Sequence, residues 1–195
     1  MTILYAVGHT KVSVPPSLIS VTYDTSTSTW GDWHTIIEDV TQDEWEDRTK
    51  WLKIRTPKSG ATGFGSTVYA YGTDGSGAVV YKSTDRGVIW TNISTGLPNG
   101  AAVNALAVKN AYLLHNYAFC SDGMVYKQTN GTGNWGTGID ISMYIRPQTV
   151  DVGYDANHTI IATGGGVTAK APEPYTIWTI LSVSGAANAV WVTPP

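Results

Sequence analysis

The sequence predicts an all-β fold, a small β-propeller of about four four-stranded blades closed into a ring, formed by one domain of 195 residues. Short segments of one pattern recur along the chain, and self-similarity at a fixed period is the signature of a repeat architecture. The recurring segments alternate apolar and small residues with the period of a half-buried strand. The chain also holds 21 Gly, 8 Trp and 11 Tyr, a composition that suits many short strands joined by tight turns.

Each repeat predicts a second strand, a third strand that ends at a Tyr-Lys pair or its equivalent, a turn, and a fourth strand that starts at a tryptophan. The second strands fall at residues 4–8, 68–72, 116–120 and 160–164. The third strands of the last three repeats end at Tyr81-Lys82, Tyr126-Lys127 and Lys170. The fourth strands start at Trp30, Trp90, Trp135 and Trp178. Because large aromatics anchor neighbouring sheets, we expect these four tryptophans to pack between blades.

A first strand is expected before each second strand. Three candidates lie at residues 51–57, 103–109 and 149–154, and the fourth lies at the far end of the chain, at 188–194. If this last segment pairs beside residues 3–7, the C-terminal strand completes the N-terminal blade and closes the ring. Closure removes open sheet edges, which otherwise invite aggregation. The other arrangement is a larger ring, in which the chain supplies half and swaps its terminal strand with a partner.

The predicted blades divide the single domain, residues 1–195, into four segments. Blade 1 comprises residues 1–37 plus 187–195, blade 2 residues 51–95, blade 3 residues 102–140 and blade 4 residues 148–184. The tryptophans recur at about the 40–50 residues that a four-stranded blade needs, except across the first interval, which carries an insertion. There Thr41 and Glu44 form a capping box, and Glu46 with Lys50 forms a helical i,i+4 pair, so we expect one short helix near 41–50.

Composition excludes several classes of function. The net charge is −3 and no cluster of Lys or Arg could neutralise a phosphate backbone, so we predict no nucleic-acid partner. No signal peptide is evident and no apolar run approaches the ~20 residues that span a bilayer, so we predict synthesis in a host cytoplasm without membrane insertion. The His and Asp/Glu residues lack metal-ligand spacing, and we predict neither a metal nor a cofactor.

Residues 83–90 carry the pattern Ser83-x-Asp85-x-Gly87-x-x-Trp90. A tight turn favours Asp and Gly at such positions. The pattern resembles the Asp-box (BNR repeat) of sialidase-like and sortilin-like β-propellers. The resemblance implies a turn between third and fourth strands, in which Asp85 accepts backbone hydrogen bonds, Gly87 supplies unusual backbone angles and Trp90 packs between blades.

Only this copy of the box is intact. In the copy that ends at Trp135, Asn130 replaces the Asp and Thr132 the Gly. In the first and last copies, Thr25 and Glu173 stand at the Asp position. We therefore read the box as a structural turn that sets the register of the blades.

The same family includes sialidases, which bind the substrate carboxylate through three arginines and use a tyrosine nucleophile paired with a glutamate. This chain offers only four arginines, and they are Arg48, Arg55, Arg86 and Arg146. Arg86 lies inside the predicted turn, on the face opposite a typical active site. Family glycosidases also have six or more blades. We predict that the chain is not an enzyme and assign no catalytic residue; a small glycosidase is the least favoured interpretation.

The loops that join fourth to first and second to third strands form the face on which propellers often bind ligands. There we expect Trp45, Asp74, Tyr144 and Arg146, with Trp45 and Tyr144 as exposed aromatics able to stack on sugars. A small, cysteine-poor propeller rich in Thr, Gly, Ser and Asn is similar to surface proteins of bacteriophage virions. We therefore expect a non-enzymatic virion component, a decoration, tail-tip or fibre-associated protein that docks on other virion proteins or on itself. The alternative is a lectin-like propeller that binds surface glycans.

Overall fold

The computed structural model describes most of the chain between residues 2 and 183. The described ranges are 2–8, 17–24, 26–32, 34–37, 52–57, 66–109, 115–143, 149–154, 159–164, 167–172 and 179–183. The predicted helix near 41–50 and the predicted C-terminal strand at 188–194 lie outside these ranges. Among the described residues the structure is all-β, apart from a single turn of 3-10 helix, η1 (Thr129–Gly131).

Sixteen strands form four separate antiparallel sheets, in chain order. The first sheet contains β1 (Thr2–Gly8), β2 (Ser17–Asp24), β3 (Thr29–Trp30) and β4 (His34–Ile37). The second contains β5 (Leu52–Arg55), β6 (Val68–Thr73), β7 (Ala78–Ser83) and β8 (Thr91–Asn92). The third contains β9 (Val103–Ala107), β10 (Asn116–Cys120), β11 (Met124–Gln128) and β12 (Ile139–Asp140). The fourth contains β13 (Thr149–Tyr154), β14 (Thr159–Gly164), β15 (Val167–Pro172) and β16 (Thr179–Val183).

The last three sheets are simple meanders, in which each strand pairs with the next one along the chain. The first sheet differs, because β2 pairs with β1 on one side and with both β3 and β4 on the other. In the third sheet the tryptophan does not start the fourth strand. Trp135 forms only an isolated bridge to Gln128, and β12 begins further on, at Ile139.

Two apolar clusters hold the last three sheets together, face to face. Between the second and third sheets lie Tyr69, Tyr71, Val80, Val103, Leu106, Ala118 and Trp135, among others. Between the third and fourth sheets the cluster is rich in alanine, with Ala105, Ala107, Ala162, Ala169 and Ala171 around Tyr117 and Phe119. Strands β6 and β10 are buried over almost their whole length, on both faces. Burial on both faces explains why these strands read as nearly continuous apolar runs.

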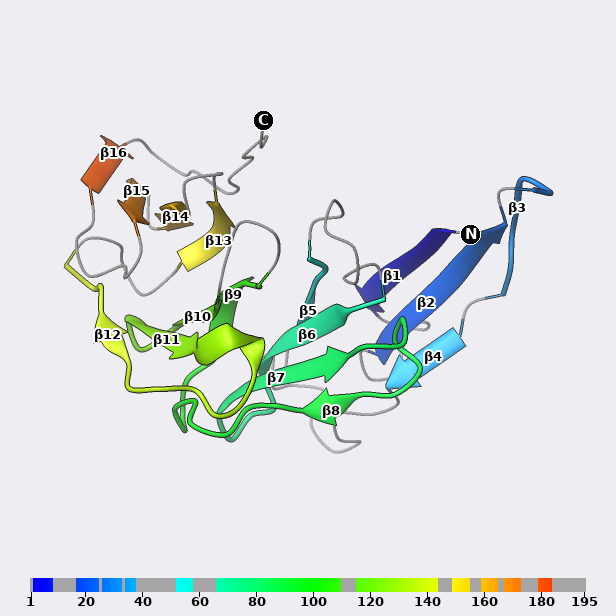
Figure 1. The fold of residues 1–195 in the computed structure, drawn as a ribbon, viewed down its shortest axis with the longest axis horizontal. Coiled ribbons are helices and arrows are strands. Elements are labelled where there is room, and N and C mark those ends of the chain that lie inside the picture. Colours follow the sequence, from blue (N-terminus) through cyan, green and yellow to red (C-terminus); the bar gives the residue numbers. More distant parts are fainter. Residues whose placement is uncertain are drawn as a thin grey trace.

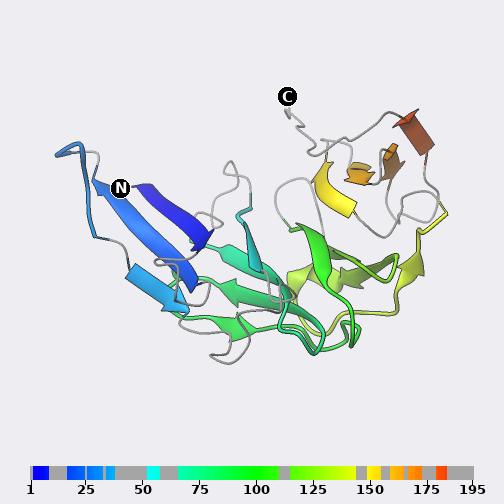
Figure 2. The same cartoon turned by 180° about the vertical axis from the view of Figure 1, so that it is seen from behind.

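The four sheets form an open arc and not a closed ring, so the prediction of a closed four-bladed propeller is wrong. Contacts join neighbouring sheets in chain order, β1 with β5, β6 with β9, and β9 with β13. Figures 1 and 2 show the first and fourth sheets at opposite ends of the molecule, far from each other. No segment among the described residues pairs with the outer edge of β1.

The fourth sheet packs through one face of β15. Ala169 and Ala171 of β15 are fully buried against the third sheet. Lys170 and Pro172 alternate with them and are exposed on the opposite face. Ile180 and Leu181 of β16 are also about half exposed, so the exposed side chains of this sheet are both polar and apolar. The alternation of residues along each strand predicts the individual sheets. It does not predict whether the first and last sheets meet to close a ring.

Candidate functional site

The turn between β7 and β8, residues 83–90, is closed by one hydroxyl and one carboxylate. Ser83 Oγ donates to Asp85 Oδ1 (2.7 Å) and accepts the backbone N–H of Gly87 (2.7 Å). Asp85 Oδ1 also accepts the backbone N–H groups of Val88 (3.1 Å) and Ile89 (2.9 Å). Gly87 has a φ of 85°, in the left-handed region where a residue without a Cβ is favoured. These side-chain bonds lie within the turn, and the backbone N–H of Arg86 donates to the carbonyl of Ser66, just before β6, at 2.8 Å.

The hydrogen bonds stabilise the ionised form of Asp85. The backbone N–H of Ile89 and the hydroxyl of Ser83 lower the pKa of the Asp85 carboxyl, because both donate to the charged form. The indole N–H of Trp90 donates to the Gly87 carbonyl at 2.9 Å, within the same turn. Trp90 is half-buried.

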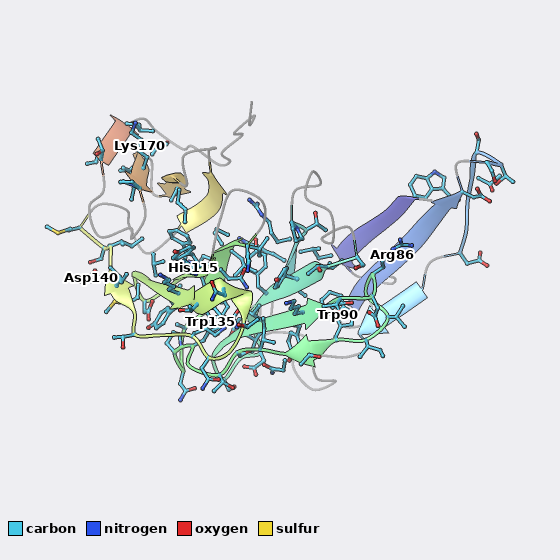
Figure 3. The ribbon with its side chains drawn as sticks, viewed as in Figure 1. Arg86, Trp90, His115, Trp135, Asp140 and Lys170 are labelled. Carbon is cyan, nitrogen blue, oxygen red and sulfur yellow. The ribbon has the colours of Figure 1, made fainter. Side chains whose placement is uncertain are left out.

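Two apolar side chains project from this fixed backbone. Val88 is 77% exposed and Ile89 is 68% exposed, although the N–H groups of both are held by Asp85. Figure 3 shows the turn, marked by Arg86 and Trp90, at the end of the second sheet nearest the first. Two adjacent large aliphatic side chains are therefore exposed on this turn, and we call Val88 and Ile89 the apolar tip.

The corresponding turn of the third sheet, residues 128–135, is closed by a different set of contacts. Gln128 is 1% exposed; its Nε2 donates to the Gly133 carbonyl (2.7 Å) and its Oε1 accepts from Asn116 Nδ2 (2.8 Å). Asn130 and Gly131 have φ of 55° and 68°, so the left-handed pair is Asn130-Gly131. In the second-sheet turn the left-handed pair is Arg86-Gly87. Counting back from the tryptophan therefore aligned Thr132 with Gly87, whereas Gly131 takes the glycine's role.

Trp135 is the one predicted tryptophan that lies buried between two sheets in the described part of the chain. It is 4% exposed and packs in the cluster between the second and third sheets. Its indole N–H donates to the Ile93 carbonyl (2.7 Å), and its backbone N–H to the Thr95 carbonyl (2.9 Å). Residues 93–100, the connecting segment after β8, therefore tie the second sheet to the turn of the third.

The other predicted site residues are not brought together. Trp30 is 56% exposed, so it is not the inter-sheet anchor that we predicted. Asp74 lies in the β6–β7 turn, where its Oδ1 accepts from Ser76 N, Ser76 Oγ and Gly77 N. Partial burial acts to raise the pKa of Asp74, but these hydrogen bonds outweigh it and hold the pKa below its usual value. Trp45, Tyr144, Arg146 and Trp178 lie outside the described residues, as do Thr25, Arg48 and Glu173.

Sequence reasoning missed a polar junction between the second and third sheets. Lys82 Nζ lies 5.8 Å from the centre of the Tyr69 ring, its cross-strand partner. Burial raises the pKa of Tyr69, and the nearby side chain of Asn116 acts in the opposite direction. Asn116 Oδ1 accepts the backbone N–H of Lys109 at 2.6 Å. The Tyr-Ala and Tyr-Lys repeats were the available signal, because antiparallel pairing sets Tyr69 opposite Lys82 and Tyr117 opposite Lys127.

The third-sheet side of this junction is also fixed. Lys109 Nζ donates to the Asn130 carbonyl at 3.2 Å. The backbone N–H of Asn130 donates to His115 Nδ1 at 2.9 Å, which assigns the proton of a neutral imidazole to Nε2. Burial lowers the pKa of Lys82, and the nearby charge of Lys109 lowers it further.

No cluster of three or more His, Cys, Asp or Glu residues with metal-binding geometry occurs among the described residues. Cys120 is buried in β10, and burial raises the pKa of its thiol, which disfavours the reactive thiolate. In the same portion of the chain, no helix is long and apolar enough to cross a membrane.

Comparisons with models of protein families and with curated proteins found no match to this chain. The turn at residues 83–90 is closed by the side chains of Ser83 and Asp85. Membership of the Asp-box family stays a prediction.

Proposed function

We propose that this protein is a non-enzymatic structural module, a bacteriophage virion surface component that docks on a larger assembly. The observation that carries the proposal is the apolar tip, Val88 and Ile89, exposed on a backbone that Asp85 holds in place. Interface cores are enriched in apolar residues, and a preordered loop loses little conformational freedom when it binds. The composition, with few charges, one Cys and abundant Thr, Gly, Ser and Asn, supports the assignment to a virion surface.

The contacts of the turn explain why it suits docking. The hydroxyl oxygen of Ser83 and the Oδ1 of Asp85 both accept hydrogen bonds from backbone N–H groups of the turn itself. A partner that covers Val88 and Ile89 therefore does not have to break these hydrogen bonds. Burying each aliphatic side chain contributes about 1.5–3 kcal/mol, which is roughly tenfold or more in affinity.

Three observations test the proposal. Mass spectrometry of purified particles should detect the polypeptide, and the gene should lie among capsid or tail genes. The double variant Val88→Ser/Ile89→Ser should reduce incorporation into particles by at least about tenfold, because the turn keeps its backbone hydrogen bonds while the apolar area is lost. Met143→Ser is the matched control, since Met143 is 80% exposed elsewhere on the molecule and should leave incorporation unchanged.

Particles without the polypeptide would rule out the virion assignment. Equal incorporation of the double variant and the control would remove the apolar tip as the docking element. A glycan array that binds the wild type and the double variant alike would favour the lectin-like alternative instead.

A further inference from the structure

We propose that His115 makes the turn at residues 128–135 an acid-sensitive switch, in which protonation of the imidazole weakens the turn that carries Trp135. This proposal is independent of the proposed function. It rests on the hydrogen bond that the backbone N–H of Asn130 donates to His115 Nδ1, at 2.9 Å. Only a ring nitrogen without a proton can accept this bond, so the turn in this form requires a neutral imidazole.

The turn of the second sheet shows what is special about His115. Each turn contains a left-handed residue that is not glycine, Arg86 with a φ of 64° and Asn130 with a φ of 55°. In both turns, the backbone N–H of that residue donates to the segment just before the second strand of its sheet. Arg86 donates to the backbone carbonyl of Ser66 at 2.8 Å, whereas Asn130 donates to a histidine ring. The third sheet therefore has a titratable acceptor where the second sheet has a peptide carbonyl, which does not titrate.

The carbonyl of Asn130 is bound by a cation. Lys109 Nζ donates to it at 3.2 Å, so Lys109 and His115 together hold a residue that carries a Cβ in the left-handed region. Protonation of Nδ1 would set two N–H groups against each other. It would also bring a second positive charge to a residue that already binds one. Both effects favour the neutral imidazole in the folded state.

The other charged groups of the third sheet do not replace this bond. The ring of Tyr117 meets the imidazole edge-on, with the ring centres 6.1 Å apart, and Lys127 is the cross-strand partner of Tyr117. Asp122 and Asp140 lie at the opposite end of the sheet, where Asp122 binds the backbone N–H of Met124 and Asp140 pairs with Met124 (Figure 3). Lys127 is a cation, which does not favour protonation of a nearby imidazole.

The two neighbouring sheets also carry charged residues. On the fourth sheet, Asp151 pairs with Thr163 and Lys170 pairs with Ile161, two register positions that alternate with the buried Ala162. On the second sheet, Lys82 lies against the ring of Tyr69, which packs on the face of the third sheet opposite to that of Tyr117. The switch is therefore assigned to His115 and to its contacts with Asn130.

The direction of the pH dependence follows from the bond. The imidazole of the unfolded chain takes up a proton as the pH falls through about 6.5, whereas the folded state resists protonation. The contribution of the bond to stability is therefore fully present above this pH and is lost as the pH falls below it. The effect reaches the second sheet, because the same turn ends at Trp135, whose indole N–H donates to the Ile93 carbonyl.

The test is the thermal unfolding of the purified chain between about pH 8 and about pH 5, the range in which histidine titrates. His115→Asn keeps an acceptor oxygen near the place of Nδ1 and does not titrate. Between these two pH values we expect the wild-type Tm to fall by at least about 2 °C more than that of His115→Asn, the shift expected for one hydrogen bond in a chain of this size. His115→Phe keeps a ring against Tyr117 without an acceptor, so its Tm should already be below wild type at the higher pH.

His34→Asn is the matched control, because it removes a histidine from β4 of the first sheet and should keep the wild-type response to acid. A second readout needs no folded variant of His115: nitrogen NMR of the wild type, labelled at histidine, should show one neutral ring with its proton on Nε2, hydrogen-bonded at Nδ1. Equal falls of Tm in wild type and His115→Asn would overturn the proposal. A response abolished by His34→Asn, or a spectrum without such a ring, would do the same.

Discussion

The turns at residues 83–90 and 128–135 occupy the same place in neighbouring sheets and are stabilised in opposite ways. In the second sheet, the hydrogen bonds given for the side chains of Ser83 and Asp85 join residues of the same turn, and the tip of the turn is exposed. In the third sheet, Gln128 bonds to Asn116 of a neighbouring strand, and Trp135 is bound to the connecting segment of the second sheet. The turn at residues 83–90, which is closed by local bonds, therefore leaves its tip exposed. The turn at residues 128–135 uses its side chains for contacts with other strands and with the second sheet.

The largest effect is expected for Trp135→Ala, which tests whether the third-sheet turn holds two sheets together. Truncation opens a cavity in the cluster around Leu106. It also removes the indole N–H that donates to the Ile93 carbonyl. We expect a loss of about 3–5 kcal/mol in the free energy of unfolding, measured with urea. Trp90→Ala is the control in the other turn. Because Trp90 is half-buried and bonds within its own turn, a loss as large as that of Trp135→Ala would contradict the comparison.

The next largest effect is expected for Gly96→Ala, which tests whether the connecting segment, residues 93–100, packs closely against Trp135. A Cβ at Gly96 would overlap the carbonyl oxygen of Trp135, and Gly96 has a φ of 98°. We expect Gly96→Ala to reduce the free energy of unfolding by at least about 2 kcal/mol, since overpacking and backbone strain add. Gly100→Ala separates the two causes, because Gly100 has a φ of 71° but nothing within 4 Å of its added Cβ. Equal losses in the two variants would show that Gly96 does not depend on the contact with Trp135.

A smaller effect is expected for Gln128→Ala. The change leaves the Nδ2 of the buried Asn116 without this partner, at a cost of about 1–3 kcal/mol, whereas Gly133 is exposed and its carbonyl can bond to water. A double-mutant cycle with Asn116→Ala should show a coupling energy of about 0.5 kcal/mol or more. Strict additivity of the two losses would mean that the hydrogen bond between Asn116 and Gln128 does not contribute.

The smallest effect concerns Asp85 and depends on pH. The folded protein holds the pKa of Asp85 below its ordinary value of 3.8, so the folded state binds fewer protons than the unfolded state in that range. This contribution to stability is fully present above pH 3.8 and is lost as the pH falls through the folded-state pKa. In Tm measurements from acid to neutral pH, Asp85→Asn should lie below wild type at neutral pH and approach it in acid. A difference independent of pH would argue against the carboxylate.

The sequence predicted the all-β class because alternation and turn residues are local signals. The Tyr-Ala and Tyr-Lys repeats located strands such as β6 and β10, where paired residues share a face and must alternate together. The register of the third-sheet turn was harder. Trp135 bonds to residues of another sheet, so its distance from Gly131 differs from that of Trp90 from Gly87, and counting back from the tryptophan shifted the match by one residue.

The candidate sites divide in the same way. Ser83, Asp85 and Gly87 could be named from the sequence because every bond that they make in the turn spans a few residues. The polar contacts of Lys82 with Tyr69 and of Asn116 with Lys109 could not, since each joins residues of separate strands. No pattern along the chain encodes which side chains of separate strands become neighbours. The prediction that Trp30 packs between sheets was wrong for the same reason, because the exposure of Trp30 depends on how the first sheet packs against other sheets.

The sequence by itself determined the strands, the tight turns and the side-chain bonds of residues 83–90, because periodicity and turn chemistry act over short separations. Only the tertiary structure decided that the described sheets form an open arc (Figure 1) and that Trp135 joins two sheets while Trp30 is exposed. These outcomes depend on how one sheet packs on the next. Packing angles accumulate over the whole stack, and no single repeat specifies their sum.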